Sequence, residues 1–343
     1  MSFKRLAALA ALACAFALPA ISPAWAGQTF DAVKAKGFVQ CAVNTGLAGF
    51  SFADSQGKWT GLDIDLCKAI AVAMFGDAEK VKFTPTTAQQ RFVALQSGEV
   101  DVITRNATQT LLRDTQLGFN GAGVNFYDGQ GFMVPAKSGI KSARELNGAT
   151  ICVQPGTTTE LNLADYFRKH KMTFKPVLID KLDELLQAYA SGRCDSYTTD
   201  ASGLAGVRAG QLSDKGEQVI LPERISKEPL GPMVRHGDDQ WFDVVRFVLD
   251  GMVEAEELGI GQANVDEMLK SDDPVIKRFL GVTPGYGKAV GVDEAWMYKI
   301  VKLIGNYGDS FERNVGKNTP LKLERGLNAL WTNGGLMYAI PFR

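Results

Sequence analysis

The sequence predicts an α/β protein of two lobes, each built on a doubly wound, mostly parallel sheet. Three observations predict this fold. A segment at 94–104 is repeated at 188–198, strand-like and helix-like segments alternate in two successive units, and two extended stretches link the units. Strands that alternate with helices at this spacing are typical of a parallel sheet covered by helices. We therefore expect two similar lobes joined by two crossing segments.

The repeated segment places Ala, Ser, Gly, Asp and Thr at matching positions in both copies. In each copy a helical end runs into a Ser-Gly turn and then into a short strand. The copies differ after the strand, where the first continues to Asn106, Thr108 and Arg113 and the second to Asp200. A guanidinium in one lobe and a carboxylate in the other would suit the two ends of a zwitterion. The repeat therefore predicts a small ligand held between the lobes.

The N-terminus reads as a Sec-type signal peptide, residues 1–26, with cleavage after Ala26. Lys4 and Arg5 precede a short apolar run, and Ala24-Trp25-Ala26 supplies small residues at the cut. A membrane-spanning helix needs about 20 apolar residues, so the run is too short to be an anchor. A lipoprotein site at Cys14 is an alternative that the flanking residues fit poorly. We expect an exported, soluble, periplasmic protein.

Length and charge limit the class of protein. The chain has 343 residues with 37 Lys and Arg against 38 Asp and Glu, a net charge of −1. This length exceeds the usual size of a single hydrophobic core, so two domains are expected. A net charge near zero argues against nucleic acid or an anionic membrane surface as partner. We expect a monomer with a small-molecule ligand and no nucleic-acid partner.

The cysteines that follow the signal peptide predict disulfides. They are Cys41, Cys67, Cys152 and Cys194. An even number in an oxidising compartment favours two disulfides, although four cysteines allow three pairings. We favour Cys41–Cys67 and Cys152–Cys194, because each pair then lies within one lobe. A metal site is improbable, since there is no Cys-x-x-Cys spacing and the only histidines are His170 and His236. We expect no metal and no cofactor.

The expected elements divide between the lobes in chain order. The first lobe is discontinuous, with residues 27–130 and 232–343, and the second comprises 131–231. The first has strands at 38–43, 81–83 and 100–104, and helices at 63–75, which Asp63 would cap, 92–96 and 242–258. The second has strands at 149–153, 174–179 and 194–198, and helices at 157–170 and 181–190. Extended crossings at 129–135 and 229–234 would form the hinge. Tail helices at 296–304 and 323–330 are expected to pack on the first lobe.

Candidate ligand contacts follow the strands. Open α/β sheets bind ligands at the carboxyl ends of their strands. Arg113 offers a planar fork that matches a carboxylate, although its spacing also suits a surface arginine in a first helical turn. Thr157 and Glu160 have capping-box spacing, so a helix begins there, and its N-terminus suits an anion. Asp200 suits an ammonium or caps the next helix. Phe50 walls the cleft or lies in the core.

Several of these segments, taken in order, resemble a known family. They are Gly61-Leu62-Asp63-Ile64-Asp65-Leu66, Ser97-Gly98-Glu99-Val100-Asp101, Thr108 with Arg113, Gly156-Thr157-Thr158-Thr159-Glu160, and Asp200. From about residue 37 to 258 the chain resembles the periplasmic polar amino-acid-binding proteins of ABC transporters, extracellular solute-binding family 3. Its long tail is similar to that of the general L-amino-acid-binding branch.

The resemblance implies a type II periplasmic-binding-protein fold and a role for each site residue. Arg113 would pair with the substrate α-carboxylate, helped by N–H groups near Thr108 and Thr158. Asp200 would take the α-ammonium together with Asn106 and Thr108. The closed form would dock on the permease subunits of an ABC transporter.

Departures from the family pattern bear on specificity. Leu47 stands where many relatives have an aromatic that covers the ligand, and Ala88 where a bulkier residue often lines the pocket. Arg91 matches an arginine that faces a side-chain carboxylate in glutamate- and aspartate-binding relatives, and Gln89 is its neighbour. A roomy pocket with one cation and amides favours Glu, Gln, Asp and Asn within a tolerant range.

Two other classes of protein are consistent with this fold. Some exported dehydratases of aromatic amino-acid precursors resemble it, but such an enzyme needs a buried acid, and the sequence indicates none at the strand ends apart from Asp200. A ligand-sensing ectodomain would need a transmembrane segment. We therefore expect a receptor without catalytic residues.

Overall fold

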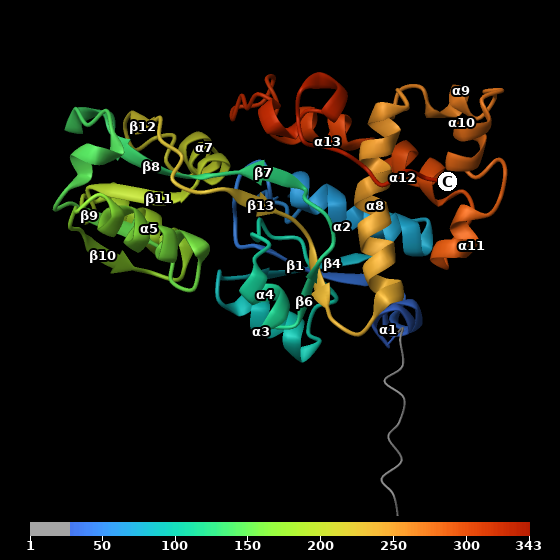
Figure 1. Cartoon of the computed structure of the whole chain (residues 1–343), viewed down its shortest axis with the longest axis horizontal. Helices are drawn as coiled ribbons and strands as arrows, with labels where there is room; N and C mark the ends of the chain where they lie inside the picture. The colour runs from blue at the N-terminus through green and yellow to red at the C-terminus, as the bar shows by residue number, and fades with distance from the viewer. Residues whose placement is uncertain (1–27) are drawn as a thin grey trace, which may run out of the picture.

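The molecule has two lobes, each organised around one five-stranded sheet (Figure 1). The structure is a computed structural model that describes residues 28–343, so the expected signal peptide lies outside the described residues. The sheets have the orders β4-β1-β5-β14-β6 and β10-β9-β11-β8-β12. The predicted α/β architecture of two lobes is confirmed. Within the described part, no helix is both long and apolar enough to cross a bilayer.

In the sheet of the first lobe, four strands run in one direction and one strand runs against them. Its strands are β1 (Val39–Asn44), β4 (Val81–Thr86), β5 (Val102–Ile103), β6 (Phe119–Gly121) and β14 (Met233–Arg235). β1 pairs parallel to β4 and β5, whereas β14 runs antiparallel to both β5 and β6. The strand that returns from the second lobe therefore completes the first sheet.

The sheet of the second lobe has the same plan. Its strands are β8 (Gln130–Pro135), β9 (Thr150–Val153), β10 (Lys175–Leu178), β11 (Ser196–Asp200) and β12 (Gln218–Ile220). β9 pairs parallel to β10 and β11, whereas β8 runs antiparallel to β11 and β12. In both sheets, the strand that arrives through the hinge takes the fourth position.

The repeated segment forms the same structure twice. In the first copy helix α3 (Gln90–Ser97) ends at Gly98 and leads to β5; in the second, α6 (Leu182–Ala190) leads through Gly192 to β11. The two glycines have φ values of 79° and 81°, in the left-handed region that glycine adopts without steric cost. The shared Ser-Gly turn is therefore a requirement of the backbone.

The aspartate of each copy ties its turn to a neighbouring strand. Asp101 accepts a hydrogen bond from the Gln40 N–H at 2.7 Å, and Asp195 accepts one from the Thr150 N–H at 2.8 Å. Gln40 belongs to β1 and Thr150 to β9, the strands with equivalent places in the two sheets. The sequence match thus reflects one interaction made twice.

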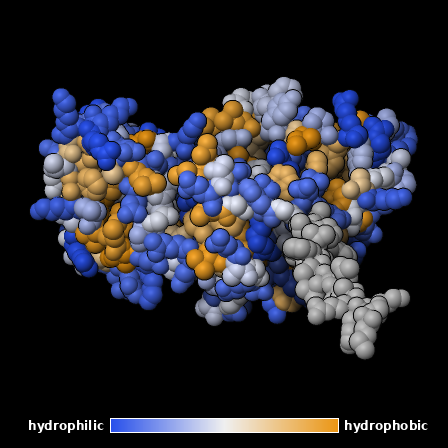
Figure 2. All heavy atoms as spheres, turned by 60° about the horizontal axis from the view of Figure 1, so that its bottom comes forward, coloured by the Kyte–Doolittle hydropathy of each residue, from blue (hydrophilic) through white to orange (hydrophobic). Residues whose placement is uncertain are grey.

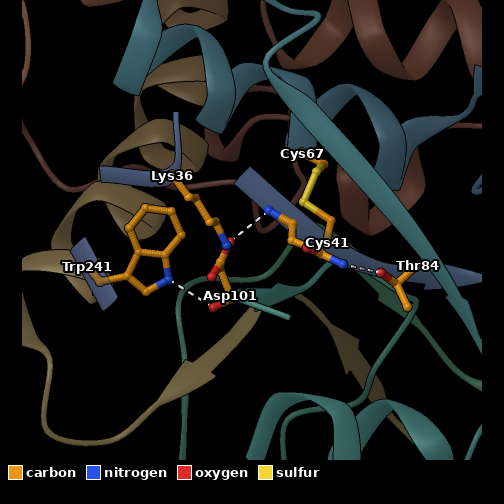
Figure 3. The surroundings of a disulfide bond; sticks show 7 residues. Lys36, Cys41, Cys67, Thr84, Asp101 and Trp241 are labelled. Atoms are coloured by element: carbon orange, nitrogen blue, oxygen red, sulfur yellow. Dashed lines mark hydrogen bonds and ion pairs between the residues drawn. A yellow bond between two sulfur atoms is a disulfide. The ribbon is translucent and has the colours of Figure 1, made fainter. Parts of the chain in front are cut away.

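Both predicted disulfides are present. Cys41–Cys67 joins β1 to helix α2 (Leu62–Phe75), and Cys152–Cys194 joins β9 to the segment before β11. Figure 3 shows Asp101 near the first disulfide, and the side chains of Lys36 and Trp241 point toward Asp101. Lys36 Nζ lies 2.5 Å from the Asp101 carboxylate, and Trp241 Nε1 donates to the Asp101 carbonyl at 3.0 Å. Each disulfide therefore braces a single lobe.

A two-stranded ribbon joins the lobes. β7 (Phe126–Asp128) pairs antiparallel with β13 (Glu228–Leu230), and the chain then continues into β8 and β14. Of the crossings predicted at 129–135 and 229–234, the first coincides with β8, directly after the ribbon, and the second runs from β13 into β14. The pairing of β7 with β13 keeps the two hinge segments side by side at the junction of the lobes.

Helices cover the faces of both sheets. Those of the first lobe are α1 (Gln28–Lys36), α2, α3, α4 (Leu111–Thr115) and α8 (Asp239–Glu257). Those of the second are α5 (Thr158–Lys169), α6 and α7 (Ala201–Ala209), with 3-10 turns Ala136–Ser138 and Ala143–Leu146. A small ribbon of β2 (Phe52–Ala53) and β3 (Trp59–Thr60) precedes α2. Figure 2 shows hydrophilic side chains over much of one face, with apolar groups scattered on both lobes.

The predicted cap of α2 is wrong. Gly61, not Asp63, is the N-cap residue. A Cβ at position 61 would lie 2.1 Å from the Phe50 carbonyl oxygen, so this close approach requires glycine. The Asp63 carboxylate instead accepts from the Asn106 N–H at 3.0 Å and from the Asn125 side chain at 3.3 Å.

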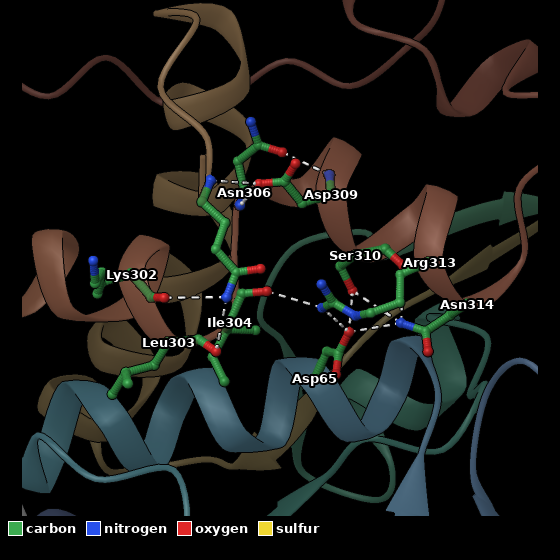
Figure 4. Close-up of polar contacts among 10 residues, drawn as sticks. Asp65, Lys302, Leu303, Ile304, Asn306, Asp309, Ser310, Arg313 and Asn314 are labelled. Atoms are coloured by element: carbon green, nitrogen blue, oxygen red, sulfur yellow. Dashed lines mark hydrogen bonds and ion pairs between the residues drawn. The ribbon is translucent and has the colours of Figure 1, made fainter. Parts of the chain in front are cut away.

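The C-terminal extension packs on the first lobe, against α2 and α8 (Figure 1). Its helices are α9 (Val265–Met268), α10 (Pro274–Phe279), α11 (Tyr286–Val290), α12 (Trp296–Leu303) and α13 (Tyr307–Asn314). In Figure 4, Asp65 of α2 faces α13. Its carboxylate accepts from Ser310 at 2.7 Å and from Arg313 and Asn314 at 2.6 Å each. The extension is therefore held by polar contacts as well as by its apolar core.

The helix predicted at 323–330 is absent, and only a 3-10 turn, Gly326–Asn328, forms there. The chain folds back on itself, because the Leu336 N–H donates to Leu327 and the Met337 N–H to Ala329. A 3-10 turn also forms at Trp331–Asn333. The Asn328 side chain accepts from the N–H of Tyr127 and donates to its carbonyl. The extension thus also contacts hinge strand β7.

Candidate ligand-binding site

The predicted site residues gather at the facing edges of the two sheets. In the first lobe they follow β1, β4 and β5, all at the carboxyl ends of parallel strands. In the second lobe they follow β9 and β11, again at carboxyl ends. This is the edge at which open α/β sheets bind ligands.

Polar contacts cross from one lobe to the other, among them a hydrogen bond from Gln211 Nε2 to the Gly46 carbonyl. Asn106 Nδ2 donates to Asp200 Oδ2 at 3.3 Å, and these residues are 94 positions apart, the offset between the repeat copies. The hydroxyls of Thr108 and Thr158 lie 3.3 Å apart. The structure therefore brings together the residues that follow the two copies.

Side-chain packing also joins the lobes. Leu47 is buried against Gly206 of α7, where a Cβ would lie 3.2 Å from Leu47 Cδ1 and 2.7 Å from the Ala48 carbonyl. The Gln89 side chain packs in the same way against Gly156, 2.8 Å from where a Cβ would be. Glycines at these two positions allow the lobes to approach closely.

Asn106 is held in an uncommon backbone conformation. Its φ is 23°, in a region where asparagine is enriched among non-glycine residues. Its N–H donates to Asp63, and its side-chain oxygen accepts from Asn44 Nδ2 at 3.1 Å. With the oxygen engaged by Asn44, the amide nitrogen is left to face Asp200.

Three guanidinium groups are buried in the first lobe. They belong to Arg91, Arg105 and Arg113. Arg113 donates to the Thr108 carbonyl at 2.6 Å, and Arg91 to the Arg105 carbonyl at 3.2 Å. The guanidinium carbons of Arg91 and Arg113 lie 4.8 and 4.7 Å from the centre of the Phe92 ring, where the ring attracts cations. Three cationic side chains are therefore gathered in this lobe, with the Asp63 carboxylate near Arg91 and Arg105.

Burial makes these charges costly. It lowers the pKa of Arg105 and of Arg113 to about 10 in each case. It lowers the pKa of Arg91 well below its ordinary value, and the neighbouring Arg105 and Arg113 cations add to the effect. An anion entering the cleft would offset the penalty, since an opposite charge favours the charged form.

Asp200 is the corresponding group in the second lobe. Burial raises its pKa to about 8, with added repulsion from Asp128 and Glu228. The Asn106 hydrogen bond and the Arg91 charge oppose this rise. A cation beside Asp200 would favour its ionised form.

Helix α5 begins where the sequence predicted, immediately after Thr157. Thr157 Oγ1 accepts from the Glu160 N–H at 3.1 Å and donates to the Gln154 carbonyl at 2.8 Å. Glu160 accepts from the Gly156 N–H at 2.8 Å instead of closing a capping box. The Thr157 hydroxyl is therefore engaged as a cap, while the Thr158 hydroxyl faces Thr108.

Phe50 lies in the core of the first lobe. It is 1% exposed, and its ring centre is 5.4 Å from that of Phe126 in an edge-to-face arrangement. Phe126 in turn stacks on Phe311 of the C-terminal extension. The sequence left open whether Phe50 walls the cleft or lies in the core. In the structure its ring packs in the core.

The expectation that Asp200 is the only acid near the strand ends is wrong. Asp63 and Glu228 are buried beside site residues, and Asp180 follows β10. Asp180 comes directly after a predicted strand, so the strand-end rule applied to Asp200 could have found it. Glu228 precedes the second crossing, and only the pairing of the hinge strands brings it to the cleft.

Family comparison identifies this architecture. The family model described as bacterial extracellular solute-binding proteins, family 3, matches residues 39–260. The chain belongs to this family. Its lobes therefore form the two-lobe periplasmic-binding-protein fold.

Close relatives within the family carry informative names. The chain is 57% identical over 317 residues to the general L-amino acid-binding periplasmic protein AapJ of Rhizobium johnstonii, covering 92% of this chain and 93% of the relative. It is 52% identical over 324 residues to the glutamate/glutamine/aspartate/asparagine-binding protein BztA of Rhodobacter capsulatus, covering 94% and 96%. Both relatives are named as binding proteins.

A solved structure extends the likeness to three dimensions. It is a periplasmic binding protein from Brucella ovis with glutathione bound, 58% identical to this chain, with a TM-score of 0.89. The match covers 92% of this chain and 99% of that one. The C-terminal extension is therefore largely included in the match.

Proposed function

We propose that this protein is the periplasmic substrate-binding component of an ABC transporter for L-amino acids. Its lobes close around the zwitterion, and the closed monomer delivers it to the permease without catalysis. The observation that carries the proposal is the separation of charge between the lobes, with Arg113 on one side and Asp200 on the other. The names of the relatives AapJ and BztA support the ligand class.

Arg113 and the start of α5 form the carboxylate end of the proposed clamp. The guanidinium matches a carboxylate in bidentate fashion. Thr158 is the first residue of α5, where amide groups lack partners within the helix and the helix dipole is positive. The contact between the Thr108 and Thr158 hydroxyls brings the two lobes together here, and backbone N–H groups, not these hydroxyls, would meet the carboxylate.

Asp200 forms the ammonium end. Its carboxyl is buried. Asp128, Glu228 and Asn106 lie near it, and of these three only Asn106 donates a hydrogen bond to it, through Nδ2. A substrate ammonium supplies the positive charge that this buried group lacks. Oxygen atoms of Asn106 and Thr108 complete the set of acceptors.

The side-chain pocket supports a lean toward Glu, Gln, Asp and Asn. Arg91 Nε and Asp180 Oδ1 are both buried, and neither has a hydrogen-bond partner among the described residues. A side-chain amide offers an acceptor to the first and donors to the second, whereas a carboxylate satisfies the first only. Leu47 and Gln89 pack against Gly206 and Gly156, at the contact between the lobes.

A thermal-shift panel of the twenty L-amino acids tests the proposal. Gln, Glu, Asn and Asp are expected to stabilise the protein most. A ligand at about 100 times its Kd adds about 2.7 kcal/mol to the free energy of unfolding. D-glutamine is the matched control. Prephenate, followed by product analysis, tests the dehydratase alternative. The proposal fails if no L-amino acid stabilises the protein.

Glutathione is a second candidate ligand, favoured by the Brucella ovis structure. Its γ-glutamyl group carries an α-amino and an α-carboxylate group, so the same clamp would hold it. It is tested in the same panel, beside L-glutamine. Stabilisation by glutathione but not by free amino acids would replace the amino-acid assignment with a γ-glutamyl peptide.

A further inference from the structure

Glu228 is a buried carboxylate in the hinge for which the proposed clamp has no role. It opens β13, is 2% exposed, and is paired through the backbone with β7. Its charge acts on both Arg113 and Asp200, raising the pKa of each. Glu228 therefore lies near both ends of the clamp.

Four side-chain donors engage this carboxylate. Oε2 accepts from the hydroxyls of Thr108 at 2.6 Å and Thr158 at 3.0 Å. Oε1 accepts from Asn162 Nδ2 at 2.7 Å and from Ser226 Oγ at 2.5 Å. An ionised carboxylate has only acceptors, so this set of four donors suits a buried anion.

The two threonine hydroxyls have one proton each. A hydroxyl carries a single donor and two acceptor lone pairs. When Thr108 and Thr158 both donate to Glu228, neither has a proton left for another partner. What their oxygens then present to the cleft is lone pairs, which attract an N–H and repel a carbonyl or carboxylate oxygen.

We propose that Glu228 is a positioning residue that holds Thr108 and Thr158 as hydrogen-bond acceptors, so that the cleft selects 2-amino acids over 2-oxo acids. This inference rests on the proposed function, since it concerns the ammonium end of the same site. A substrate ammonium donates to the Thr108 oxygen. A 2-oxo acid places a second acceptor there and is rejected.

Replacing Glu228 by glutamine removes this constraint while keeping the shape of the side chain. The amide nitrogen donates where a carboxylate oxygen accepted, so the threonine hydroxyls become free to rotate and donate toward the ligand. In Glu228→Gln, the affinity for L-glutamate should fall about tenfold, as expected for losing a hydrogen bond to a charged group. The affinity for 2-oxoglutarate should rise.

The experiment is calorimetric titration of the full-length mature protein with L-glutamate and with 2-oxoglutarate. The ratio of the two affinities should fall at least about tenfold in Glu228→Gln. An unchanged ratio overturns the inference. If 2-oxoglutarate binds neither protein detectably, the affinity for L-glutamate decides, and a value equal to that of the wild type overturns it.

A double-mutant cycle tests whether Glu228 acts by orienting the threonine hydroxyls or only through its negative charge. Thr108→Val removes the hydroxyl that receives the substrate ammonium, so adding Glu228→Gln to it should change the ratio much less than it does in the wild-type background. If Glu228 acts only as a negative charge, the change persists in the Thr108→Val background, and the inference is wrong. Ser226→Ala is the matched control, because it removes a donor to Oε1 without touching either threonine.

Loss of folding and failure of the proposed function give different results. A misfolded Glu228→Gln protein shows a lowered melting temperature and binds neither ligand, in which case Thr108→Val alone, which removes the hydroxyl that Glu228 holds, reports the selectivity, and an unchanged ratio of the two affinities overturns the inference. A wild-type protein that binds no L-amino acid contradicts the proposed function itself. Wild-type binding with equal losses for both ligands contradicts only the role of Glu228.

Discussion

The two copies of the repeated segment fold in the same way but are followed by different residues. Each copy has a left-handed glycine after a helix and an aspartate bound to the N–H of the neighbouring strand. After these shared residues, the first copy continues into a loop with Asn106 at positive φ, whereas the second ends at Asp200, where α7 begins. The duplicated part therefore builds the lobes, and the ligand chemistry lies in the residues beyond it.

The residues that follow the two copies differ in charge. The first lobe buries three guanidinium groups near its strand ends, and burial lowers the pKa of each. The second presents Asp200, whose pKa is raised by burial. Each lobe thus buries an ionisable group whose charged form it does not favour alone, and this favours a ligand bearing the opposite charges at its two ends.

The largest expected effect on affinity comes from removing the side chain of Arg113 or of Asp200. Arg113→Ala and Asp200→Ala should each weaken L-amino-acid binding more than about a hundredfold, because an unpaired buried charge costs about 3–5 kcal/mol. Calorimetric titration measures the loss. Arg168→Ala is the control, since that side chain is 80% exposed and should leave affinity unchanged. Near-normal binding by either site variant would contradict the clamp.

The two disulfides test whether the lobes are equivalent in stability. They close loops with sequence separations of 26 and 42 residues, which corresponds to about 3–4 kcal/mol of stabilisation each. Cys41→Ala/Cys67→Ala and Cys152→Ala/Cys194→Ala should therefore shift urea denaturation by similar amounts. A loss confined to one pair would show that the lobes differ in how far they depend on their crosslink.

The shared aspartates should differ in importance despite matching in sequence. Asp101 is 3% exposed and also pairs with Lys36, whereas Asp195 is exposed. We expect Asp101→Ala to cost about 2–3 kcal/mol of unfolding free energy and Asp195→Ala about 1 kcal/mol, since only the first removes a buried carboxylate and leaves two part-buried donors, Gln40 N–H and Lys36 Nζ, unpaired. Urea denaturation of both variants measures this. Equal costs would mean that burial does not distinguish the copies.

Titration should distinguish the lobes by a smaller, graded effect. The Asp200 pKa is about 8, above the ordinary aspartate value of 3.8, so between these values the folded protein holds a proton that the unfolded chain releases. The free energy of unfolding should therefore fall as pH rises from about 4 to about 8, by at most about 1.4 kcal/mol per pH unit from this group. Asp128, Glu228, Arg91 and Asn106 face it and modulate the change.

Asp200→Asn should remove this share of the pH dependence. Chemical denaturation without ligand at pH 5, 6, 7 and 8 compares the variant with the wild type. Arg105 and Arg113 stay charged over this range, because the pKa of each is about 10. Parallel curves for the two proteins would contradict the assignment of this proton to Asp200.

What the sequence predicted well depends on local or repeated signals. The repeat and the strand-helix alternation follow from residues close in the chain, and both disulfide pairings follow from the division of the chain into lobes. The helix start at Thr158 follows from the capping spacing of Thr157 and Glu160. The contact between Asn106 and Asp200 agrees with the constant offset of the copies.

What it did not predict depends on contacts between distant segments. Glu228 meets Thr108 across 120 positions, and no local pattern marks that pairing. The helix predicted at 323–330 has suitable periodicity, but the return of the chain at Leu336 and the contact of Asn328 with Tyr127 prevail. Asp63 is of a residue type that often caps helices. The cap of α2 nevertheless lies at Gly61, because only glycine can approach the backbone of Phe50 so closely.

The fourth position of each sheet has a consequence for the order of folding. β14 inserts between β5 and β6 of the first lobe, although the whole second lobe separates it from them in the chain. The second sheet needs only β8 to β12, which are continuous in the chain. Because chains fold from the N-terminus during synthesis and distant pairings form slowly, we expect the second lobe to finish first. Until residue 235 has emerged, the first sheet is incomplete, and its exposed strand edges need protection from aggregation.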